Sequence, residues 1–473
     1  MLTYDLDRRG KLARYDYLYR CIREDILAGR LTAGEKLPSK RSLASHLQTA
    51  VITVQNAYAQ LEAEGYLYTR EKRGYYVADV ERHPAAPGRA PARSAPQPQR
   101  SWLLDLSSGG SGTEDFPFSV WAKLMRRVLS EEGEALLRAT PPNGADALRR
   151  AIAQHLYRFR GISAAPEQIV VGAGTEYLYN LIVQLLGREA VYGVEDPGYS
   201  KAARIYALGG ARTAPVLVDE GGVSLRSLEM SGAQILHTSP NHQFPTGAVT
   251  PIGRRQSLLR WAEAREGRYI IEDDYDSEFR FTLRPIPTLQ SIDRAGRVIY
   301  VNTFSRTLAP SLRISYMVLP KSLTERYRAQ LGFYSSTVPA MEQYTLARFL
   351  DEGYFEAHIN RMRKSYRAQR DAVIDTILES PLGEHCRVSG EDAGMHFLLT
   401  IDTKCTDHVL RADAEGRGVR LSFLSDFALR PGSAPQHTLV IHYPGIDLGR
   451  LHSALSILEA LLYFRDWKYK GRK

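Results

Sequence analysis

The spacing of apolar residues at the start of the chain predicts a compact group of three helices and a hairpin. Apolar residues recur at helical spacing from Tyr15 to Ala28, and Gly29 ends this pattern. A second helix is expected from Ser39, a suitable N-cap, to Leu47, and a third from about Ile52 to Glu64. Two β-rich runs then flank the charged tip Glu71-Lys72-Arg73, which predicts a two-stranded hairpin.

Beyond about residue 100, strand-like apolar runs alternate with helical patterns. The runs lie at residues 168–171, 234–238, 268–272 and 297–302. Strands separated by helices cannot pair as hairpins, so the alternation predicts a mainly parallel sheet with helices on both faces. From about residue 342, a long polar-faced helical pattern leads to strands at 395–401 and 438–443. This order suits a smaller α+β lobe.

The segment between residues 81 and 101 separates the two patterns. It carries prolines among Ala, Gln and Arg and has almost no apolar side chain to bury, so we interpret it as an extended linker. Its arginines could touch DNA phosphates, but a solvated linker is the favoured interpretation. We therefore predict one domain at 11–80 and a second at 102–473, with a smaller lobe from about 342.

Length and composition narrow the classes of protein to which the chain can belong. A chain of 473 residues is too long for one ordinary domain, and 44% hydrophobic with 24% charged residues is typical of a soluble globular protein. There is no apolar run of about 18 residues and no signal-peptide core, so we expect a cytoplasmic protein without a membrane partner. Three widely spaced cysteines suggest neither disulfides nor a zinc site. The net charge of +9 permits nucleic-acid binding without demonstrating it.

Residues 11 to 78 resemble a GntR-type winged helix-turn-helix. The matching stretches are Gly29-Arg30-Leu31, Gly34-Glu-Lys-Leu-Pro-Ser-Lys-Arg-Ser-Leu-Ala44 and Thr53-Val-Gln-Asn-Ala-Tyr-Ala-Gln-Leu-Glu-Ala-Glu-Gly-Tyr-Leu67. The resemblance implies binding of double-stranded DNA, with the third helix in the major groove and the hairpin wing on phosphates or the adjacent minor groove. The residues expected to contact DNA are Arg41, Thr53, Gln55, Lys72 and Arg73.

One departure concerns the start of the third helix. Many members of the family carry a Ser/Thr-Arg pair there, whereas this chain has Ala50 and Val51. The change removes a strong donor and leaves the target sequence open. The alternative interpretation of this domain is a protein-docking module.

The stretch Asn302-Thr-Phe-Ser-Arg-Thr-Leu-Ala-Pro-Ser-Leu-Arg-Ile-Ser-Tyr316 resembles the lysine-bearing segment of fold-type I aminotransferases, which use pyridoxal phosphate (PLP). In that family, the position of Arg306 is the lysine that forms a Schiff base with the cofactor. A guanidinium stays charged at physiological pH and is no carbonyl nucleophile. The resemblance therefore implies an α/β domain of this fold type that lacks its covalent catalyst, and it makes Thr303 and Arg313 phosphate ligands.

Three further segments follow the chain order of the same family. Gly174 and Thr175 lie where a strand leads into a helix, which suits a phosphate, although a dinucleotide site would want a glycine in place of Tyr177. Tyr199 matches a tyrosine that contacts the cofactor ring, with an ordinary core or turn tyrosine as the alternative. Asp273 matches the partner of the pyridine nitrogen, and Tyr275 the partner of the ring hydroxyl.

A metal site is the alternative interpretation of the acidic segment around Asp273. It would use Glu272, Asp273, Asp274 and Asp276. No histidine lies nearby in the sequence and no calcium-loop glycine falls at the right place, so we predict no metal.

Two family features of the aminotransferases are missing. Phe244-Pro245 stands where aminotransferases usually have Asn-Pro, so the asparagine for the ring hydroxyl is absent; His242 and Gln243 are the candidates to replace it. The strand Leu439-Val-Ile-His-Tyr443 contains no arginine to clamp a substrate carboxylate. A transaminase that lacks both lysine and clamp cannot run its usual cycle.

A GntR-type head, a linker and an aminotransferase-like domain together resemble the MocR family of transcriptional regulators. The resemblance implies a head-to-tail homodimer in which PLP, bound without a covalent bond and often with an amino compound, acts as effector. Two rival interpretations remain: a PLP-dependent enzyme with a fused DNA-binding head, and a regulator whose large domain only dimerises.

Overall fold

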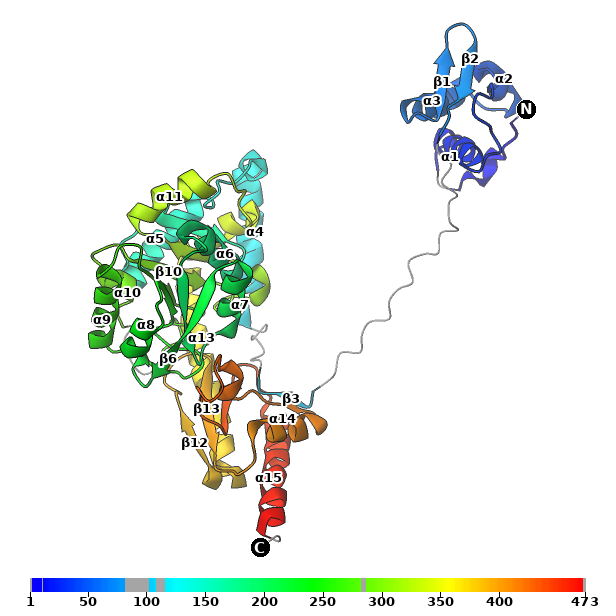
Figure 1. Ribbon diagram of the computed structural model, residues 1–473. Helices are drawn as coiled ribbons and strands as arrows, with labels where there is room; N and C mark the ends of the chain where they lie inside the picture. Colours follow the sequence, from blue (N-terminus) through cyan, green and yellow to red (C-terminus); the bar gives the residue numbers. More distant parts are fainter. Residues whose placement is uncertain (1, 11, 81–101, 108–114, 282–285, 471–473) are drawn as a thin grey trace. The chain divides into compact units, whose positions relative to one another are not determined.

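The protein forms two compact units, residues 1–99 and 100–473 (Figure 1). The computed structural model describes residues 2–10, 12–80, 102–107, 115–281 and 286–470, the last nine by their backbone only. The predicted linker, residues 81–101, lies outside the described residues. Each unit is therefore described by itself.

The N-terminal unit has the element order expected from its sequence pattern. Its elements are α1 (Arg14–Leu27), α2 (Lys40–His46), α3 (Val51–Ala63), β1 (Leu67–Arg70) and β2 (Gly74–Val77). The Ser39 hydroxyl accepts a hydrogen bond from the backbone N–H of Ser42 and so caps α2, as predicted. The two strands pair antiparallel, with Leu67 opposite Val77. This is a winged helix-turn-helix.

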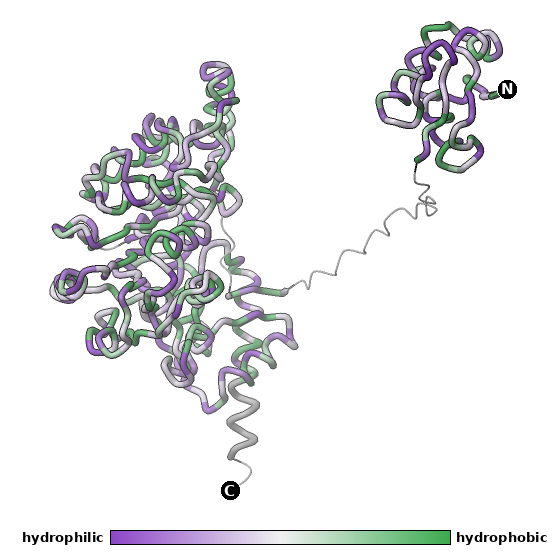
Figure 2. The backbone as a smooth tube through the Cα atoms, turned by 45° about the horizontal axis from the view of Figure 1, so that its top comes forward, coloured by the Kyte–Doolittle hydropathy of each residue, from purple (hydrophilic) through white to green (hydrophobic). Residues whose placement is uncertain are grey.

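Apolar residues one helical turn apart build the core of this unit. Leu18, Ile22 and Ile26 lie on one face of α1 and are buried. They pack in one cluster with residues of α2, α3 and both strands, among them Val54 and Tyr58. Figure 2 shows the alternation of hydrophobic and hydrophilic positions along the backbone that this packing requires.

The second unit is built on a large, mainly parallel sheet. Its strands run in the order β4-β11-β10-β9-β8-β5-β6-β7, and β11 and β7 are antiparallel to their neighbours. Their bounds are β4 (Ile169–Gly172), β5 (Val191–Asp196), β6 (Arg212–Asp219), β7 (Gly222–Val223), β8 (Ile235–Thr238), β9 (Tyr269–Asp273), β10 (Val298–Thr303) and β11 (Ser315–Val318).

Helices cover both faces of this sheet, as β10 shows. Ile299 and Val301 pack in a cluster with α6, α7 and α11. Val298 packs with α8, α9 and α10, and Tyr300 with α4, α5 and α12. The helices are α4 (Phe118–Glu132), α5 (Asp146–Arg160), α6 (Thr175–Leu186), α7 (Ser200–Leu208), α8 (Leu225–Met230), α9 (Ile252–Glu263), α10 (Leu289–Ile292), α11 (Lys321–Leu331), α12 (Ala340–Asp351) and α13 (Tyr354–Glu379).

A smaller lobe follows α13. Its antiparallel sheet has the order β12-β13-β15, and β14 pairs in parallel with β3. The bounds are β3 (Leu104–Asp105), β12 (Cys386–Ser389), β13 (His396–Ile401), α14 (Asp407–Gly416), β14 (Val419–Arg420), β15 (Thr438–His442) and α15 (Leu448–Lys470). The boundary expected near residue 342 falls inside α12, which packs against α4 and α5.

The carboxyl ends of the parallel strands position the candidate site. Thr175 begins the helix that follows β4, Tyr199 lies just after β5, and Ser239 directly follows β8. Asp273 ends β9 and Thr303 ends β10. In open α/β sheets, ligands bind in the crevice at this edge, so five separate segments of the chain meet where a ligand is expected.

Candidate functional site

The predicted DNA-contacting residues lie on α2, on α3 and at the tip of the hairpin. Arg41 and Gln55 are exposed, and so are Lys72 and Arg73 at the turn between β1 and β2. Thr53 is half-buried rather than fully exposed. The helix pair and the hairpin thus present a set of donors of the kind that phosphate and base-edge contacts use.

Aromatic rings and an arginine stiffen the hairpin. The rings of Tyr68 and Tyr76 stack across the two strands with their centroids 5.7 Å apart. The Arg70 guanidinium lies 4.9 Å from the centroid of the Tyr76 ring. Cross-strand aromatic pairs and cation–π contacts of this kind hold a two-stranded ribbon in one shape. These contacts therefore hold in one shape the two strands that carry the charged tip.

The start of α3 presents apolar side chains to solvent. Val51 is 43% exposed and Ile52 is 58% exposed. In the major groove, an apolar side chain can contact the methyl group of thymine, which a hydrogen-bond donor cannot recognise. Sequence reasoning identified the missing donor at Val51 but did not single out Ile52.

A pocket at the sheet edge brings together most of the predicted cofactor residues. Six of the eight line it, and Gly174 and Arg313 lie beside it. The lining is Thr175, Tyr179, Tyr199, Ser239, Phe244, Asp273, Tyr275, Thr303 and Arg306. Tyr179 and Ser239 were not predicted, because nothing local in the sequence distinguishes them from ordinary helix and strand-end residues.

Asp273 carries the clearest ligand signal in this pocket. The Tyr179 hydroxyl donates to Asp273 Oδ2 at 2.5 Å, and His237 Nε2 lies 3.4 Å from the same oxygen. Asp273 Oδ1 is buried and has no hydrogen-bond partner among the described residues. An unpaired buried carboxylate oxygen is costly, so it calls for a donor from outside the chain. The protonated nitrogen of a pyridine ring is such a donor.

The N-terminus of α6 forms an anion site beside this carboxylate. Gly174 precedes Thr175 with a φ of +93°, and a Cβ added at Gly174 would collide with the Arg313 guanidinium. Arg313 itself has a φ of +51°, a conformation that costs a non-glycine residue about 1 kcal/mol. Its Nη2 atom is 3.6 Å from Glu176 Oε2, a loose contact on a half-exposed side chain. Glycine, helix terminus and arginine together suit a phosphate group.

Thr303 lines this pocket, and its hydroxyl is hydrogen-bonded within the protein. Its hydroxyl accepts hydrogen bonds from Ser315 Oγ at 2.7 Å and from the Ser305 N–H at 3.1 Å. The hydroxyl is therefore engaged within the protein, and Thr303 fixes the turn that leads to Arg306.

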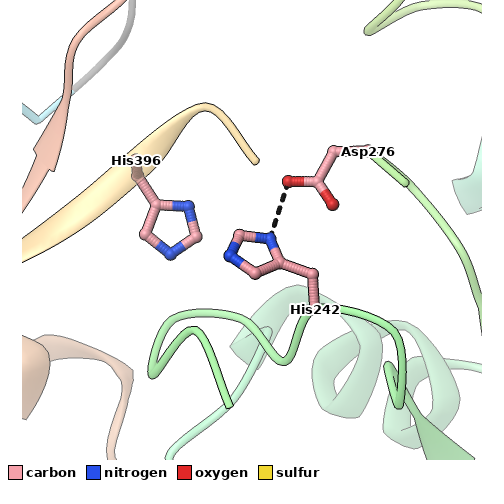
Figure 3. A group of neighbouring side chains, drawn as sticks. All are labelled: His242, Asp276 and His396. Carbon is pink, nitrogen blue, oxygen red and sulfur yellow. Dashed lines mark hydrogen bonds and ion pairs between the residues drawn. The ribbon is translucent and has the colours of Figure 1, made fainter. Parts of the chain in front are cut away.

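Tyr275 is tied to a buried group of three side chains, which Figure 3 shows. Burial, then the Asp276 charge, raises the pKa of Tyr275 well above its usual value. Its hydroxyl lies 3.2 Å from His242 Nδ1, which in turn lies 2.9 Å from Asp276 Oδ2. The ring of His396, on β13, faces that of His242 (Figure 3).

Of the two candidates to replace the missing asparagine, His242 touches Tyr275, whereas Gln243 is engaged elsewhere. The Gln243 side-chain amide donates to Glu195 Oε2 at 3.1 Å and to the Pro197 carbonyl at 3.0 Å. Gln243 thus ties its loop to the end of β5. Phe244, which stands at the asparagine position, lines the pocket with its ring 6.4 Å from that of Tyr199.

The acidic segment does not form the four-carboxylate site considered as an alternative. Glu272 accepts hydrogen bonds from the N–H groups of Leu289 and Gln290, and Asp274 pairs with Arg160. Glu272 and Asp274 are thus each engaged with partners of their own. His242, Asp276 and His396 instead hold one ligand-type atom each, all within 4.8 Å of one another. Sequence reasoning missed this group because the two histidines are distant from Asp276 along the chain.

Arg306 lies at the turn after β10, where it is exposed and lines the pocket. Within the described part of the chain, its side chain makes no ion pair and no hydrogen bond. Burial, then the charge of Arg306, lowers the pKa of His442 to about 4. His442 stands on β15, the strand in which no clamp arginine was found. The positive charge of Arg306 therefore affects a side chain of the smaller lobe.

Fold and site together define a class of protein: a winged-helix DNA reader joined to an aminotransferase-type ligand domain. Comparison with known families agrees. The gntR family of bacterial regulatory proteins matches residues 14–77, and the aminotransferase class I and II family matches residues 103–417.

Several curated relatives share this whole arrangement. The uncharacterized HTH-type transcriptional regulator YdeL of Bacillus subtilis is 36% identical, covering 97% of this chain and 99% of its own. The probable rhizopine catabolism regulatory protein MocR of Rhizobium meliloti is 34% identical over 96% and 95%. The pyridoxine biosynthesis regulator PdxR of Corynebacterium glutamicum is 34% identical over 86% and 87%.

Solved aminotransferases share the fold of the second unit. A multiple substrate aminotransferase from Thermococcus profundus superposes with a TM-score of 0.69 at 22% identity, covering 78% of this chain and 93% of its own. The α-aminoadipate aminotransferase LysN from Thermus thermophilus, complexed with N-(5'-phosphopyridoxyl)-L-leucine, gives a TM-score of 0.65 at 26% identity over 76% and 92%.

The chain belongs to the MocR family, in which a GntR head is fused to an aminotransferase class I and II domain. It is a DNA-binding transcriptional regulator with an aminotransferase-like domain. Among the described residues, no helix is long and apolar enough to cross a membrane.

Proposed function

We propose that the aminotransferase-like domain binds PLP, or a related vitamin B6 or amino compound, without a covalent bond and as an effector of DNA binding. The observation that carries this proposal is the unpaired, buried Asp273 Oδ1 in the pocket at the sheet edge. A bound pyridinium nitrogen would satisfy it, and a chain that had lost its ligand would have no reason to keep it unpaired.

The residues present fit such a ligand. Asp273 would hold the ring nitrogen, and Tyr275 would meet the ring hydroxyl. Tyr199 supplies an aromatic surface for the ring. Gly174 and Thr175 would bind the phosphate through the N-terminus of α6, with Arg313 alongside.

Arg306 argues for an effector rather than a catalytic cofactor. When bound in an enzyme, PLP supplies an aldehyde that condenses with amines and a ring that withdraws electrons. A guanidinium cannot form the covalent link that a lysine makes at this position. The segment Leu439–Tyr443 also offers no arginine for a substrate carboxylate. Both absences disfavour the alternative, a transaminase with a fused DNA-binding head.

A head-to-tail homodimer completes the proposal. Large apolar side chains on and after α4 are exposed: Phe118 by 70%, Leu129 by 47% and Leu137 by 82%. Exposed apolar residues close together in the sequence are typical of a protein interface, and a second copy is the partner that family membership suggests. Ligand binding would then change the half-site spacing that paired heads can span.

An absorbance titration of the purified protein with PLP and with pyridoxamine phosphate tests ligand binding. Both should bind reversibly, and Arg313→Ala should weaken binding at least about tenfold, because the variant cannot make a charge-assisted bond to the phosphate. Arg294→Ala, at an exposed arginine before β10, is the matched control and should bind like the wild type. Equal affinity in wild type and Arg313→Ala would show that the ligand does not use this site.

A further inference from the structure

Two parts of the pocket already have a proposed role in ligand binding, and a third part does not. Asp273 offers an unpaired acceptor at one end. The N-terminus of α6, with Arg313 against Gly174, offers an anion site at the second. Arg306 is the remaining charged group of the lining, and neither of these two roles requires it.

Arg306 lines the pocket, whereas Arg313, the arginine of the anion site, is not among the lining residues. The charge of Arg306 acts on Tyr275 and on His442, which stands on β15 of the smaller lobe. It also acts on Tyr199 and on His396, which stands on β13. Arg313, by contrast, lies against the N-terminus of α6. The two arginines therefore hold different positions at the site.

Among the described residues, no carboxylate around the pocket forms an ion pair with Arg306. Asp276 pairs with His242, and Asp273 lies by Tyr179 and His237. Glu195 accepts hydrogen bonds from the Thr238 hydroxyl at 2.5 Å and from the Ser239 N–H at 3.1 Å. Arg306 therefore lines the pocket as a guanidinium without an ion-pair partner among the described residues.

The charge of Arg306 favours one kind of substituent on the bound ring. An aminomethyl group is cationic at neutral pH and would meet a like charge. An aldehyde oxygen accepts a hydrogen bond from the guanidinium but carries no negative charge to attract it. A carboxylate accepts two parallel, charge-assisted bonds from a guanidinium, which is the strongest of the three contacts.

We propose that Arg306 selects for a carboxylate: the site prefers a phosphorylated pyridine ring whose substituent nearest Arg306 carries a carboxyl group. This inference rests on the proposed function and names the ligand class of the same pocket. The carboxylate can come from two sources, an acid group directly on the ring or an amino acid already joined to the ring through its nitrogen.

Calorimetric titration of the full-length protein with matched ligand pairs tests the proposal. For the amino acid source, N-(5'-phosphopyridoxyl)-L-leucine is compared with N-(5'-phosphopyridoxyl)-3-methylbutylamine, which differs only by the missing carboxylate. For the ring-acid source, 4-pyridoxic acid 5'-phosphate is compared with PLP. In at least one pair, the wild type should bind the carboxylate at least about tenfold more tightly.

Variants at Arg306 separate charge recognition from a general effect on the fold. Arg306→Gln should abolish the preference, so that the two members of each pair bind within about twofold of one another. Arg306→Lys should keep part of the preference for the leucine adduct, because an ammonium attracts a carboxylate without gripping it at two points. Arg306 is exposed, so thermal melts of both variants should match the wild type.

The outcomes distinguish this inference from the proposed function. If the wild type binds both members of each pair equally, or if Arg306→Gln keeps the preference, the carboxylate selection is wrong and the proposed function stands. If no phosphopyridoxyl compound binds at all, the proposed function fails with it.

Discussion

At the scale of single residues, the proposed function depends most on Arg306. It follows β10 and lines the pocket together with Tyr275 and Asp273. Asp273 keeps a free acceptor there. Under the proposed function, Asp273 and Tyr275 hold the ring of the ligand, and Arg306 stands where the resemblance to aminotransferases expects the reactive lysine.

We predict that Arg306→Lys restores covalent trapping of PLP. The lysine amine can condense with the aldehyde, and borohydride should then fix PLP on residue 306, with a new visible absorbance band before reduction. The wild type and Arg306→Gln should retain no reduced adduct at this position. Peptide mapping after reduction measures the result, and a stable adduct on the wild-type residue would overturn this interpretation of Arg306. Transaminase turnover should stay negligible in both proteins, because no arginine stands between Leu439 and Tyr443.

At the scale of elements, the recognition helix and the wing should contribute differently to DNA binding. Thr53 and Gln55 lie on α3, whose start also exposes Ile52, whereas Lys72 and Arg73 lie at the hairpin tip. Base-edge contacts specify sequence, and phosphate contacts do not.

Accordingly, Gln55→Ala and Ile52→Ser should relax sequence preference, by about 1–3 kcal/mol for each base that the variant no longer reads. Lys72→Ala and Arg73→Ala should weaken binding to all sequences alike and reduce the salt dependence by about one phosphate each. Binding of the residue 1–80 fragment to a selected site and to a scrambled one, over a salt series, measures both effects. Equal weakening on the two DNAs for all four variants would contradict this division of roles.

The sequence predicted local elements well and long-range contacts poorly. The expected helix from Ser39 to Leu47 is α2 with its Ser39 cap, because helical spacing and capping are local properties. The pairing of β3 with β14 joins segments far apart in the chain, and neither two-residue strand has a periodicity to detect. The group of His242, Asp276 and His396 was missed for the same reason. Its members stand on three separate segments of the chain, one of them in the smaller lobe.

The candidate pocket shows the same division. Thr175, Asp273 and Thr303 were found because each lies at the end of a recognisable strand or start of a helix. Tyr179 was missed because a tyrosine inside an apolar helix looks like core, and it is buried. Only the fold shows that its hydroxyl meets Asp273.

At the scale of the whole molecule, the two units must influence each other for the chain to be a ligand-controlled regulator. One unit carries a DNA-reading surface, and the other carries a pocket in which the described residues leave an acceptor and a cation unpaired. Ligand control requires that the ligand bind the DNA-bound and DNA-free states with different affinities. By linkage, DNA must then change ligand affinity by the same factor.

The most direct test of this account measures the affinity of the full-length protein for a DNA selected from a random pool, at fixed salt, with and without saturating ligand. The ligand should be the tighter-binding phosphopyridoxyl compound, and Asp273→Asn, which lacks the carboxylate for the ring nitrogen, is the control. The account predicts that the ligand shifts the DNA dissociation constant of the wild type at least about fivefold and leaves that of Asp273→Asn unchanged. An unchanged constant in a wild type that demonstrably binds the ligand, or an equal shift in Asp273→Asn, would contradict it.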